Sequence, residues 1–483
     1  MAASSFGARA GAILLGGQWI KYVIQLVALV VLSRMLPKSD FGIVAIVTAI
    51  VAVAATVGDL GLSTAALQAP VLSHEQKSNL FWLNTGCGFV FTSALFFAAP
   101  LVADIYDQPE LRWVCRVLAF LFVVAGIGAQ FRVEGNRTGS YSRVALADVL
   151  GGVIGVLGAL ILAFLGHGLV ALTVQALLAP LATVVILVGL TPWKPGLPRR
   201  HAGTRPLLTR GLTIVVVHLV NAISSNVDQI ALGKYHPAGL VGAYNRGLQI
   251  SVAPLRQIMT PMTRLVVPRM SQAEGDIRTK AEFGLGAHGP VSLLCALGCG
   301  LIALNAPFVV RLALGGQWPE VAPIVAVLAL SSIINASASI YYWLLVATTR
   351  VTTLFWSEFW PRLAMIASIL IVARWGAVPV AVCILAGNVL MVVSACLYAV
   401  PKTGLSSRFA LGLSLRWTWG VLVFAVAGLV AEFGLLRSLV PDTWLGQITQ
   451  LVITGLLLLA SSLLSSDTRR YTARLLARLR PQS

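Results

Sequence analysis

Charged residues are scarce in this sequence: Asp, Glu, Lys and Arg make up 11% of its 483 residues, and only 17 residues are acidic. Soluble domains carry about 25% charged residues. Apolar types here reach 58%, with a mean hydropathy of +0.87. A water-facing globule cannot hide that much apolar surface, so lipid must cover it. The composition excludes a soluble fold and predicts an all-α integral membrane protein.

Motifs for catalysis and metal binding are also missing. The sequence contains no Walker A motif, no HExxH and no loop of the GxSxG type, and its six cysteines form no CxxC pair. We therefore expect no enzyme activity, no catalytic residues, no metal site and no cofactor. The net charge of +18 is attributed to basic cytoplasmic loops, which membrane proteins require for orientation, so nucleic acid is not an expected partner.

Long uncharged runs divide the chain into segments of about 20 residues, the length that crosses the hydrocarbon core of a bilayer. Most Lys and Arg fall in alternate segments between these runs. The positive-inside rule then predicts that both termini are cytoplasmic. About 14 transmembrane helices are expected, at residues 11–36, 41–67, 79–103, 111–131, 144–165, 168–190, 208–232, 240–267, 283–304, 320–347, 351–373, 377–400, 415–435 and 443–465.

Two pairs of turns resemble each other across the chain. Pro37 and Gly42, after the first predicted helix, match Pro237 and Gly242, after the seventh. Both six-helix blocks begin on the same side, so the repeat would be parallel, with two lobes around a central cavity and two extra C-terminal helices. A second match joins Ala99-Pro100 and Pro109-Glu110 to Ala306-Pro307 and Pro319-Glu320.

The repeat suggests a division into five parts. These are an N-terminal lobe at 1–190, a basic cytoplasmic linker at 191–207, a C-terminal lobe at 208–400, two further helices at 401–466, and a basic cytoplasmic tail at 467–483. The linker is rich in proline and arginine, as exposed connections often are.

Polar side chains form stripes within the predicted spans, at the spacing of three and four residues that defines one helix face. Charges inside a membrane are costly, so they are candidates for function or for packing. The equivalent helices of the two lobes carry their stripes at the same depth, which favours the lining of a shared cavity. The stripes are Gln18, Lys21 and Gln25 in the first helix, and His218, Asn221, Ser225 and Asp228 in the seventh.

Two more predicted helices carry charge. The helix at 240–267 places Asn245, Gln249 and Arg256 on one face, with Arg246 at its edge. In the helix at 351–373, Glu358 and Arg362 are four residues apart and can form an ion pair, for which a structural role is as reasonable as a functional one. Three other acids lie near predicted span ends and are expected to be structural: Asp59, Asp148 and Glu432.

Three segments resemble a known family over nearly the whole chain. They are LSRMLPKSDFGIVAIV (Leu32 to Val47), GDLGLSTAALQ (Gly58 to Gln68) and NVDQIALGKYHPAGLVGAYNRGLQI (Asn226 to Ile250). They are similar to stretches of the polysaccharide transport branch of the multidrug/oligosaccharidyl-lipid/polysaccharide exporter superfamily. The resemblance implies a two-lobed flippase of the bacterial inner membrane, which moves undecaprenyl-diphosphate-linked oligosaccharides outward for exopolysaccharide or lipopolysaccharide synthesis.

The resemblance also implies roles for the polar residues. A diphosphate needs cations, so Lys21, Arg246 and Arg256 are the candidates for phosphate contact. Asp228, Glu358 and Arg362 would act as counter-charges or bind a coupling ion, H⁺ or Na⁺. Partners would be the lipid-linked glycan, membrane lipid, a polysaccharide polymerase and export machinery. Sugar hydroxyls would meet Gln18, Gln25, His218, Asn221, Ser225, Asn245 and Gln249.

Two alternatives remain at this point. An ion-coupled drug or organic-cation antiporter of the same superfamily would prefer carboxylates over Lys21 and the arginines in its cavity. A membrane glycosyltransferase or polymerase would need a large outer loop with catalytic residues, and the longest predicted outer loop is the short segment from Asn305 to Pro319.

Overall fold

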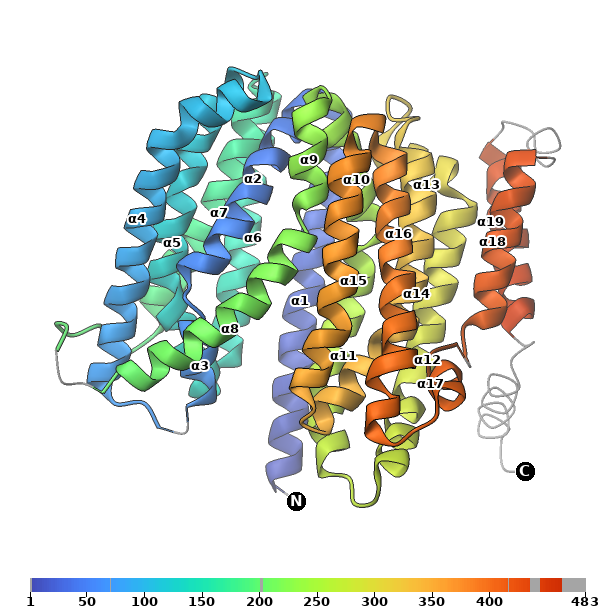
Figure 1. Ribbon diagram of the computed structural model, residues 1–483. Helices are drawn as coiled ribbons and strands as arrows, with labels where there is room; N and C mark the ends of the chain where they lie inside the picture. Colours follow the sequence, from blue (N-terminus) through green and yellow to red (C-terminus); the bar gives the residue numbers. More distant parts are fainter. Residues whose placement is uncertain (1, 70, 200–202, 416, 435–443, 463–483) are drawn as a thin grey trace, which may run out of the picture. The chain divides into compact units, whose positions relative to one another are not determined.

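The structure is a computed structural model that describes residues 2–69, 71–199, 203–415, 417–434 and 444–462. Every regular element in these ranges is a helix (Figure 1). Ten of the described helices are long and apolar enough to cross a membrane, and shorter apolar helical stretches lie at Trp419–Gly428 and Gln447–Ser462. The expectation of an all-α, multi-pass membrane protein is therefore confirmed.

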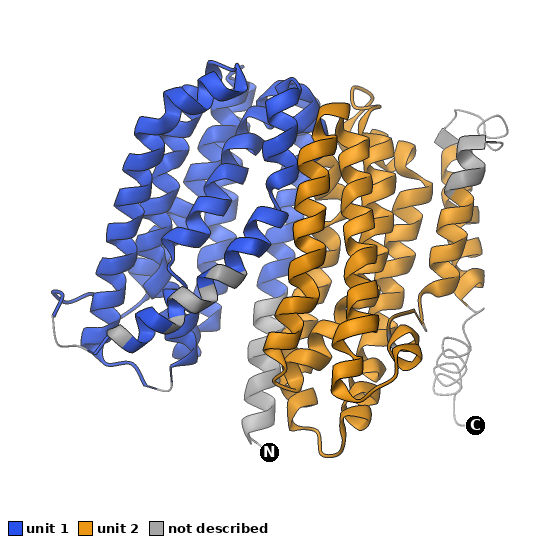
Figure 2. Ribbon diagram, in the orientation of Figure 1, with its two compact units in different colours: residues 1–245 blue, residues 246–483 orange. Residues whose placement is uncertain are grey.

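The chain forms two compact units, residues 1–245 and 246–483 (Figure 2). The helix α10 (Ala238–Ser251) runs through the boundary. Unit 1 also holds α1 (Ala2–Met35), α2 (Lys38–Gly58), α3 (Leu62–Gln68), α4 (His74–Tyr106), α5 (Glu110–Arg137), α6 (Tyr141–Phe164), α7 (Gly168–Leu190), α8 (Arg205–Ser224) and α9 (Val227–Tyr235).

Unit 2 continues with helices that surround their own apolar core, in which Met270, Tyr341 and Trp343 are almost fully buried. A short π-helix at Ala395–Ala399 follows α16. The remaining helices are α11 (Ala253–Gln272), α12 (Ile277–Leu304), α13 (Ala306–Leu314), α14 (Val321–Ala347), α15 (Val351–Val372), α16 (Ala377–Ser394), α17 (Ser407–Leu415), α18 (Trp419–Gly434) and α19 (Trp444–Ser462).

One predicted helix, at 41–67, is wrong as a single element. The structure ends α2 at Gly58 and begins α3 at Leu62. Between them, Leu60 and Gly61 adopt positive φ angles of 47° and 63°, a conformation that interrupts an α-helix and suits glycine. A Cβ atom on Gly61 would lie 2.3 Å from the backbone oxygen of Gly211 in α8. The break therefore lets α8 approach closely.

Two further predicted helices are also divided. The segment 208–232 becomes α8 and α9, because Asn226 leaves helical geometry and turns its amide back to the carbonyl of Ala222 at 2.8 Å. The segment 240–267 becomes α10 and α11, with the break at Val252. Pro254 lies just beyond it, and a proline has no N–H to continue the ladder of hydrogen bonds.

The described residues of the predicted linker before position 200 pack against α4 and α5. The Asn79 side chain exchanges hydrogen bonds of 2.7 and 2.8 Å with the Arg199 backbone. The Gly196 carbonyl accepts from the Trp82 indole at 2.9 Å, and Trp193 packs against Phe131. Helices α8 and α9 then pack on α2 and α3. The boundary between the compact units consequently follows Asn245, whereas the sequence division into lobes lies at 191–207.

The repeated turns meet in space within unit 1. A Cβ atom on Gly42 would lie 1.7 Å from the carbonyl oxygen of Ala238, and one on Gly242 would lie 2.2 Å from that of Lys38. The first turns of α2 and α10 thus cross backbone to backbone. Only glycine leaves room for such an approach. The predicted tail at 467–483 and residues 200–202 of the linker lie outside the described residues.

Candidate functional site

The first polar stripe lies on α1, which packs against α6. Gln18 and Lys21 are half-buried, and Gln25 is exposed. A Cβ atom on Gly152 of α6 would lie 4.0 Å from Cγ of Lys21, so the lysine stem passes over a position without a side chain. Such a stem can lie along the neighbouring helix while the ammonium group reaches water or a ligand.

The second stripe does not run along one continuous helix. His218 is exposed and Asn221 is half-buried on α8, while Ser225 is the exposed residue that ends this helix. Asp228 belongs to α9 and is 2% exposed. Its carboxylate accepts hydrogen bonds from the Tyr244 hydroxyl at 2.9 Å and from the Gln229 backbone at 2.8 Å. In the structure Asp228 therefore ties α9 to α10.

The predicted face at 240–267 is similarly divided. Asn245 donates a hydrogen bond of 2.7 Å to the Gln229 side chain. Arg246 and Gln249 follow on α10 and are half-buried, and Arg256 is exposed on α11. The break at Val252 places Gln249 on α10 and Arg256 on α11, so the predicted single helix is divided between them.

The expected ion pair in unit 2 is confirmed. Arg362 Nη2 lies 2.9 Å from Glu358 Oε2, and Arg362 Nε lies 3.3 Å from the same oxygen. Both residues are on α15 and half-buried. The pair reduces the cost of placing two charges in a span. Its proposed part in coupling stays a prediction.

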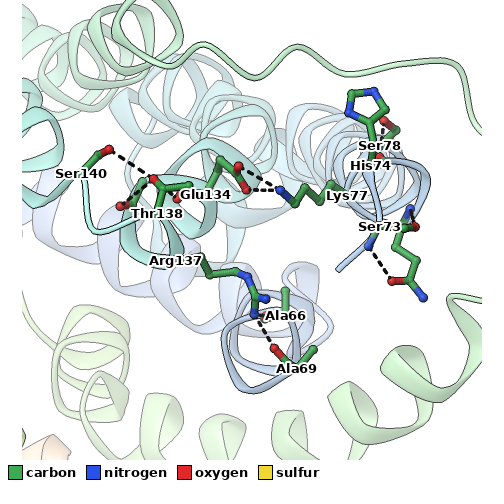
Figure 3. A network of polar contacts seen from close by, with 12 residues as sticks. Ala66, Ala69, Ser73, His74, Lys77, Ser78, Glu134, Arg137, Thr138 and Ser140 are labelled. Atoms are coloured by element: carbon green, nitrogen blue, oxygen red, sulfur yellow. Dashed lines mark hydrogen bonds and ion pairs between the residues drawn. The ribbon is translucent and has the colours of Figure 1, made fainter. Parts of the chain in front are cut away.

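Charges that the sequence did not single out form a network at one end of unit 1 (Figure 3). Lys77 Nζ on α4 lies 2.8 Å from Glu134 Oε2 on α5, and the side chains are 19% and 11% exposed. Arg137 donates to the carbonyl groups of Ala66 and Ala69 at the end of α3. The sequence analysis did not identify Glu134, because α5 extends beyond the predicted span 111–131. Lys77 lies far from Glu134 in sequence, so no local spacing connected the two residues.

We expect Glu134→Ala to lower the free energy of unfolding by about 2 to 3 kcal/mol, because the Lys77 ammonium group would stay largely buried without its carboxylate. The matched control is Glu282→Ala, which breaks an exposed pair with Arg278, at 65% and 56% exposure. That change should cost less than about 1 kcal/mol. Melting temperatures of the two purified variants measure the difference, and equal shifts would contradict the structural role of Lys77 and Glu134.

Arg132 is a second cation that the sequence analysis did not single out, and it pairs with one of the three acids that were expected to be structural. Arg132 on α5 contacts Asp148 on α6 through two hydrogen bonds of 3.0 and 2.8 Å. This geometry is the bidentate arrangement that makes arginine–carboxylate pairs strong. The structural interpretation of Asp148 agrees with this contact.

The fold resembles that of two solved membrane transporters. A solved structure entitled lipid II flippase MurJ, inward closed conformation, matches with a TM-score of 0.73 and 12% identity, over 93% of this chain and 97% of that chain. An inward-facing multidrug resistance MATE family transporter matches with a TM-score of 0.61 and 14% identity, over 82% and 98% of the two chains. At these identities the likeness concerns the fold alone.

The family is established by sequence. Residues 31–323 match the family described as "Polysaccharide biosynthesis protein", and the chain belongs to that family. The expected family is therefore confirmed. Among curated relatives, the lipopolysaccharide biosynthesis protein WzxC of Escherichia coli (strain K12) is 25% identical over 344 residues, which are 68% of this chain and 67% of that protein.

Two other curated relatives cover similar parts of the chain. The succinoglycan biosynthesis transport protein ExoT of Rhizobium meliloti (strain 1021) is 23% identical, over 69% of this chain and 67% of that protein. The teichuronic acid biosynthesis protein TuaB of Bacillus subtilis (strain 168) is 24% identical, over 65% of each. The chain thus aligns with about two thirds of the length of these relatives.

Proposed function

We propose that this protein moves undecaprenyl-diphosphate-linked oligosaccharide units from the cytoplasmic to the periplasmic leaflet of a bacterial inner membrane by alternating access. It is a transporter in polysaccharide biosynthesis and not an enzyme. The observation that carries the proposal is the family match over residues 31–323, combined with a fold shared with a lipid II flippase along most of the chain.

The proposal includes the finer architecture. About 14 spans would form two six-helix lobes at 1–190 and 208–400, with a basic linker at 191–207, two further helices at 401–466 and a cytoplasmic tail at 467–483. Each divided segment would count as one span. Both termini would be cytoplasmic, and a polymerase with its export machinery would take up the delivered units.

The polar residues of α1, α8, α10 and α11 have the chemistry that such a substrate needs. Lys21, Arg246 and Arg256 would hold the diphosphate, because ionised donors bind phosphate oxygens more strongly than neutral ones. Gln18, Gln25, Asn221, Asn245 and Gln249 would exchange hydrogen bonds with sugar hydroxyls, together with His218 and Ser225. Asp228 and the Glu358–Arg362 pair would be counter-charges.

The test is a deletion in the native host, with the gene supplied again on a plasmid as the control. We expect loss of surface or secreted polysaccharide, with lipid-linked repeat units accumulating in the cytoplasmic leaflet. Both should return to normal with the plasmid. Extraction of undecaprenyl-linked intermediates, with a leaflet-specific label for the sugar, measures this and identifies the glycan.

An antiporter is the second candidate, favoured by the likeness to a multidrug resistance transporter. It predicts a different result from the same deletion: unchanged polysaccharide and lipid pools, with new sensitivity to cationic drugs. That outcome would contradict the flippase proposal.

A further inference from the structure

Proline recurs at every third position in the segment that follows α7, at Pro192, Pro195 and Pro198. This spacing is typical of a polyproline II segment, which has three residues per turn and no hydrogen bonds within its own backbone. The residue before a proline is also restricted to extended geometry, and Thr191 has φ −93° and ψ 124°. A segment of this kind presents every third residue on one face and leaves its backbone groups free to bind other parts of the protein.

The exposure of the side chains follows this repeat of three. Trp193 is 9% exposed, and its ring centroid lies 6.2 Å from that of Phe81 on α4 and 5.2 Å from that of Phe131 on α5. Lys194 and Leu197 occupy other positions of the repeat, and both are exposed. The segment therefore packs on unit 1 through one of its faces. Aromatic rings are also what line the grooves in which proline-rich peptides bind to their receptors.

Side chains on one face of α4 bind the backbone of the same segment. The Gly196 N–H donates to the Ser78 hydroxyl at 2.9 Å, and the Gly196 carbonyl accepts from the Trp82 indole at 2.9 Å. The Asn79 amide donates to the Arg199 carbonyl at 2.7 Å and accepts from the Arg199 N–H at 2.8 Å. Each of the two anchored residues is thus held through both its backbone donor and its backbone acceptor.

This docking shortens the part of the connection that can extend between α7 and α8. Helix α7 ends at Leu190, and α8 begins at Arg205. An extended chain spans about 3.5 Å per residue, so the whole connection could reach about 50 Å. With Arg199 held on α4, only residues 200–204 separate this anchor from α8, and the maximal distance falls to about 20 Å. The docked segment therefore limits how far the start of α8 can lie from α4.

The start of α8 packs on the same part of unit 1. Leu207 is 7% exposed in an apolar cluster that includes Leu80 of α4, and Leu208 packs against this cluster. The same helix carries His218 and Asn221, which the proposed function assigns to sugar hydroxyls. A restraint on the start of α8 is consequently a restraint on the helix that would contact the sugar.

We propose that residues 193–199 form a strap, a proline-rich segment that docks reversibly on α4 and limits the movement of α8. The link to transport rests on the proposed function, through His218 and Asn221. The prolines reduce the conformational entropy that the free strap loses when it docks. Release of the strap lengthens the free tether about threefold. Because the probability of closing a flexible loop falls with the 3/2 power of its length, release should lower the population of α8 docked on unit 1 about fivefold.

Hydrogen exchange of the purified full chain measures the docking of the strap. The N–H groups of Gly196 and Arg199 are bound only to side chains of α4, so their exchange reports release of the strap. Asn79→Ala should raise the exchange rate of the strap about tenfold or more, because it removes two hydrogen bonds. Lys194→Ala is the matched control within the strap, since the Lys194 ammonium group contacts the Val188 carbonyl of α7, and it should leave the rate unchanged. Exchange of the wild-type strap as fast as that of an unfolded peptide would overturn the proposal.

A pair of insertions tests the limit on α8. A Gly-Ser insertion of about ten residues after Arg199 lengthens the free tether, whereas the same insertion after Thr191 does not, because the docked strap lies between it and α8. The reporter is the rate at which a maleimide alkylates Leu208→Cys, read by mass spectrometry of that peptide so that the native cysteines do not interfere. We expect the rate to rise about fivefold with the insertion after Arg199 and in Asn79→Ala, and to stay unchanged with the insertion after Thr191.

Equal alkylation rates in the two insertion variants would show that the strap does not limit α8. If Leu208→Cys does not fold, the exchange rates of the α8 peptides compare the same two insertions. No lipid-linked substrate is used in either measurement. A response to the insertion after Arg199 alone therefore supports the strap, even if the deletion shows that the substrate is not a lipid-linked glycan.

Discussion

Lys21→Ala is expected to reduce sharply the export of polysaccharide by cells that depend on this protein, while the protein still inserts and folds. Lys21 lies in the middle of a polar stripe on α1 whose neighbours Trp19, Ile20 and Val23 are exposed and apolar. A charged hydrogen bond is worth about 1.5 to 3 kcal/mol. Its loss from a transported diphosphate should reduce flux about tenfold or more.

The measurement is secreted polysaccharide per cell, normalised to the amount of protein in the membrane fraction. Lys21→Arg is the control, since it keeps a cation able to bind phosphate, and it should retain most of the export. Arg256→Ala, on the exposed face of α11, is expected to behave like Lys21→Ala. Normal polymer output from both alanine variants would rule out the proposed phosphate contacts.

Gly42→Ala is expected to prevent correct assembly of unit 1. The added Cβ would lie 1.7 Å from the Ala238 carbonyl oxygen, and backbone atoms of two crossing helices cannot give way as a flexible side chain can. Adding atoms to a well-packed core lowers the free energy of unfolding by about 1 to 3 kcal/mol. The distance of 1.7 Å from the added Cβ to the Ala238 oxygen is shorter than most such contacts. We therefore expect a loss of at least about 3 kcal/mol and little folded protein.

Gly86→Ala provides the comparison, because a Cβ atom at this exposed position of α4 meets nothing within 4 Å. It should leave the yield unchanged or raise it slightly, as alanine favours a helix over glycine. Yield of monodisperse protein on size exclusion, followed by the melting temperature, measures both variants. Wild-type yield and melting temperature for Gly42→Ala would show that α2 and α10 do not cross as closely as described.

Hydropathy alone located most helices well. The predicted helix at 168–190 has the bounds of α7, and those at 320–347 and 351–373 differ from α14 and α15 by one residue. Membrane helices satisfy their backbone hydrogen bonds within themselves, so a run of apolar residues is enough to predict them. The predictions failed at 41–67, 208–232 and 240–267, where apolar composition continues through a break in the backbone.

The sequence indicated which polar residues are candidates for the site, but it did not indicate how the structure arranges them. The stripe on α1 is local, so spacing found it. The stripe at His218 to Asp228 depended on a continuous helix, and Asn226 ends that helix. Asp228 then turns out to be buried against Tyr244, which is sixteen residues away along the chain.

The sequence by itself determined that this chain is an all-helical membrane protein of the polysaccharide biosynthesis family. The apolar runs that lipid covers and the motifs of the family are both formed by residues that are close together in sequence. Only the tertiary structure decided which helices break and which charges are paired. Two of the close pairs are far apart in sequence: Lys77 with Glu134, and Gly42 with Ala238. Their meeting depends on how helices cross, which no local periodicity encodes.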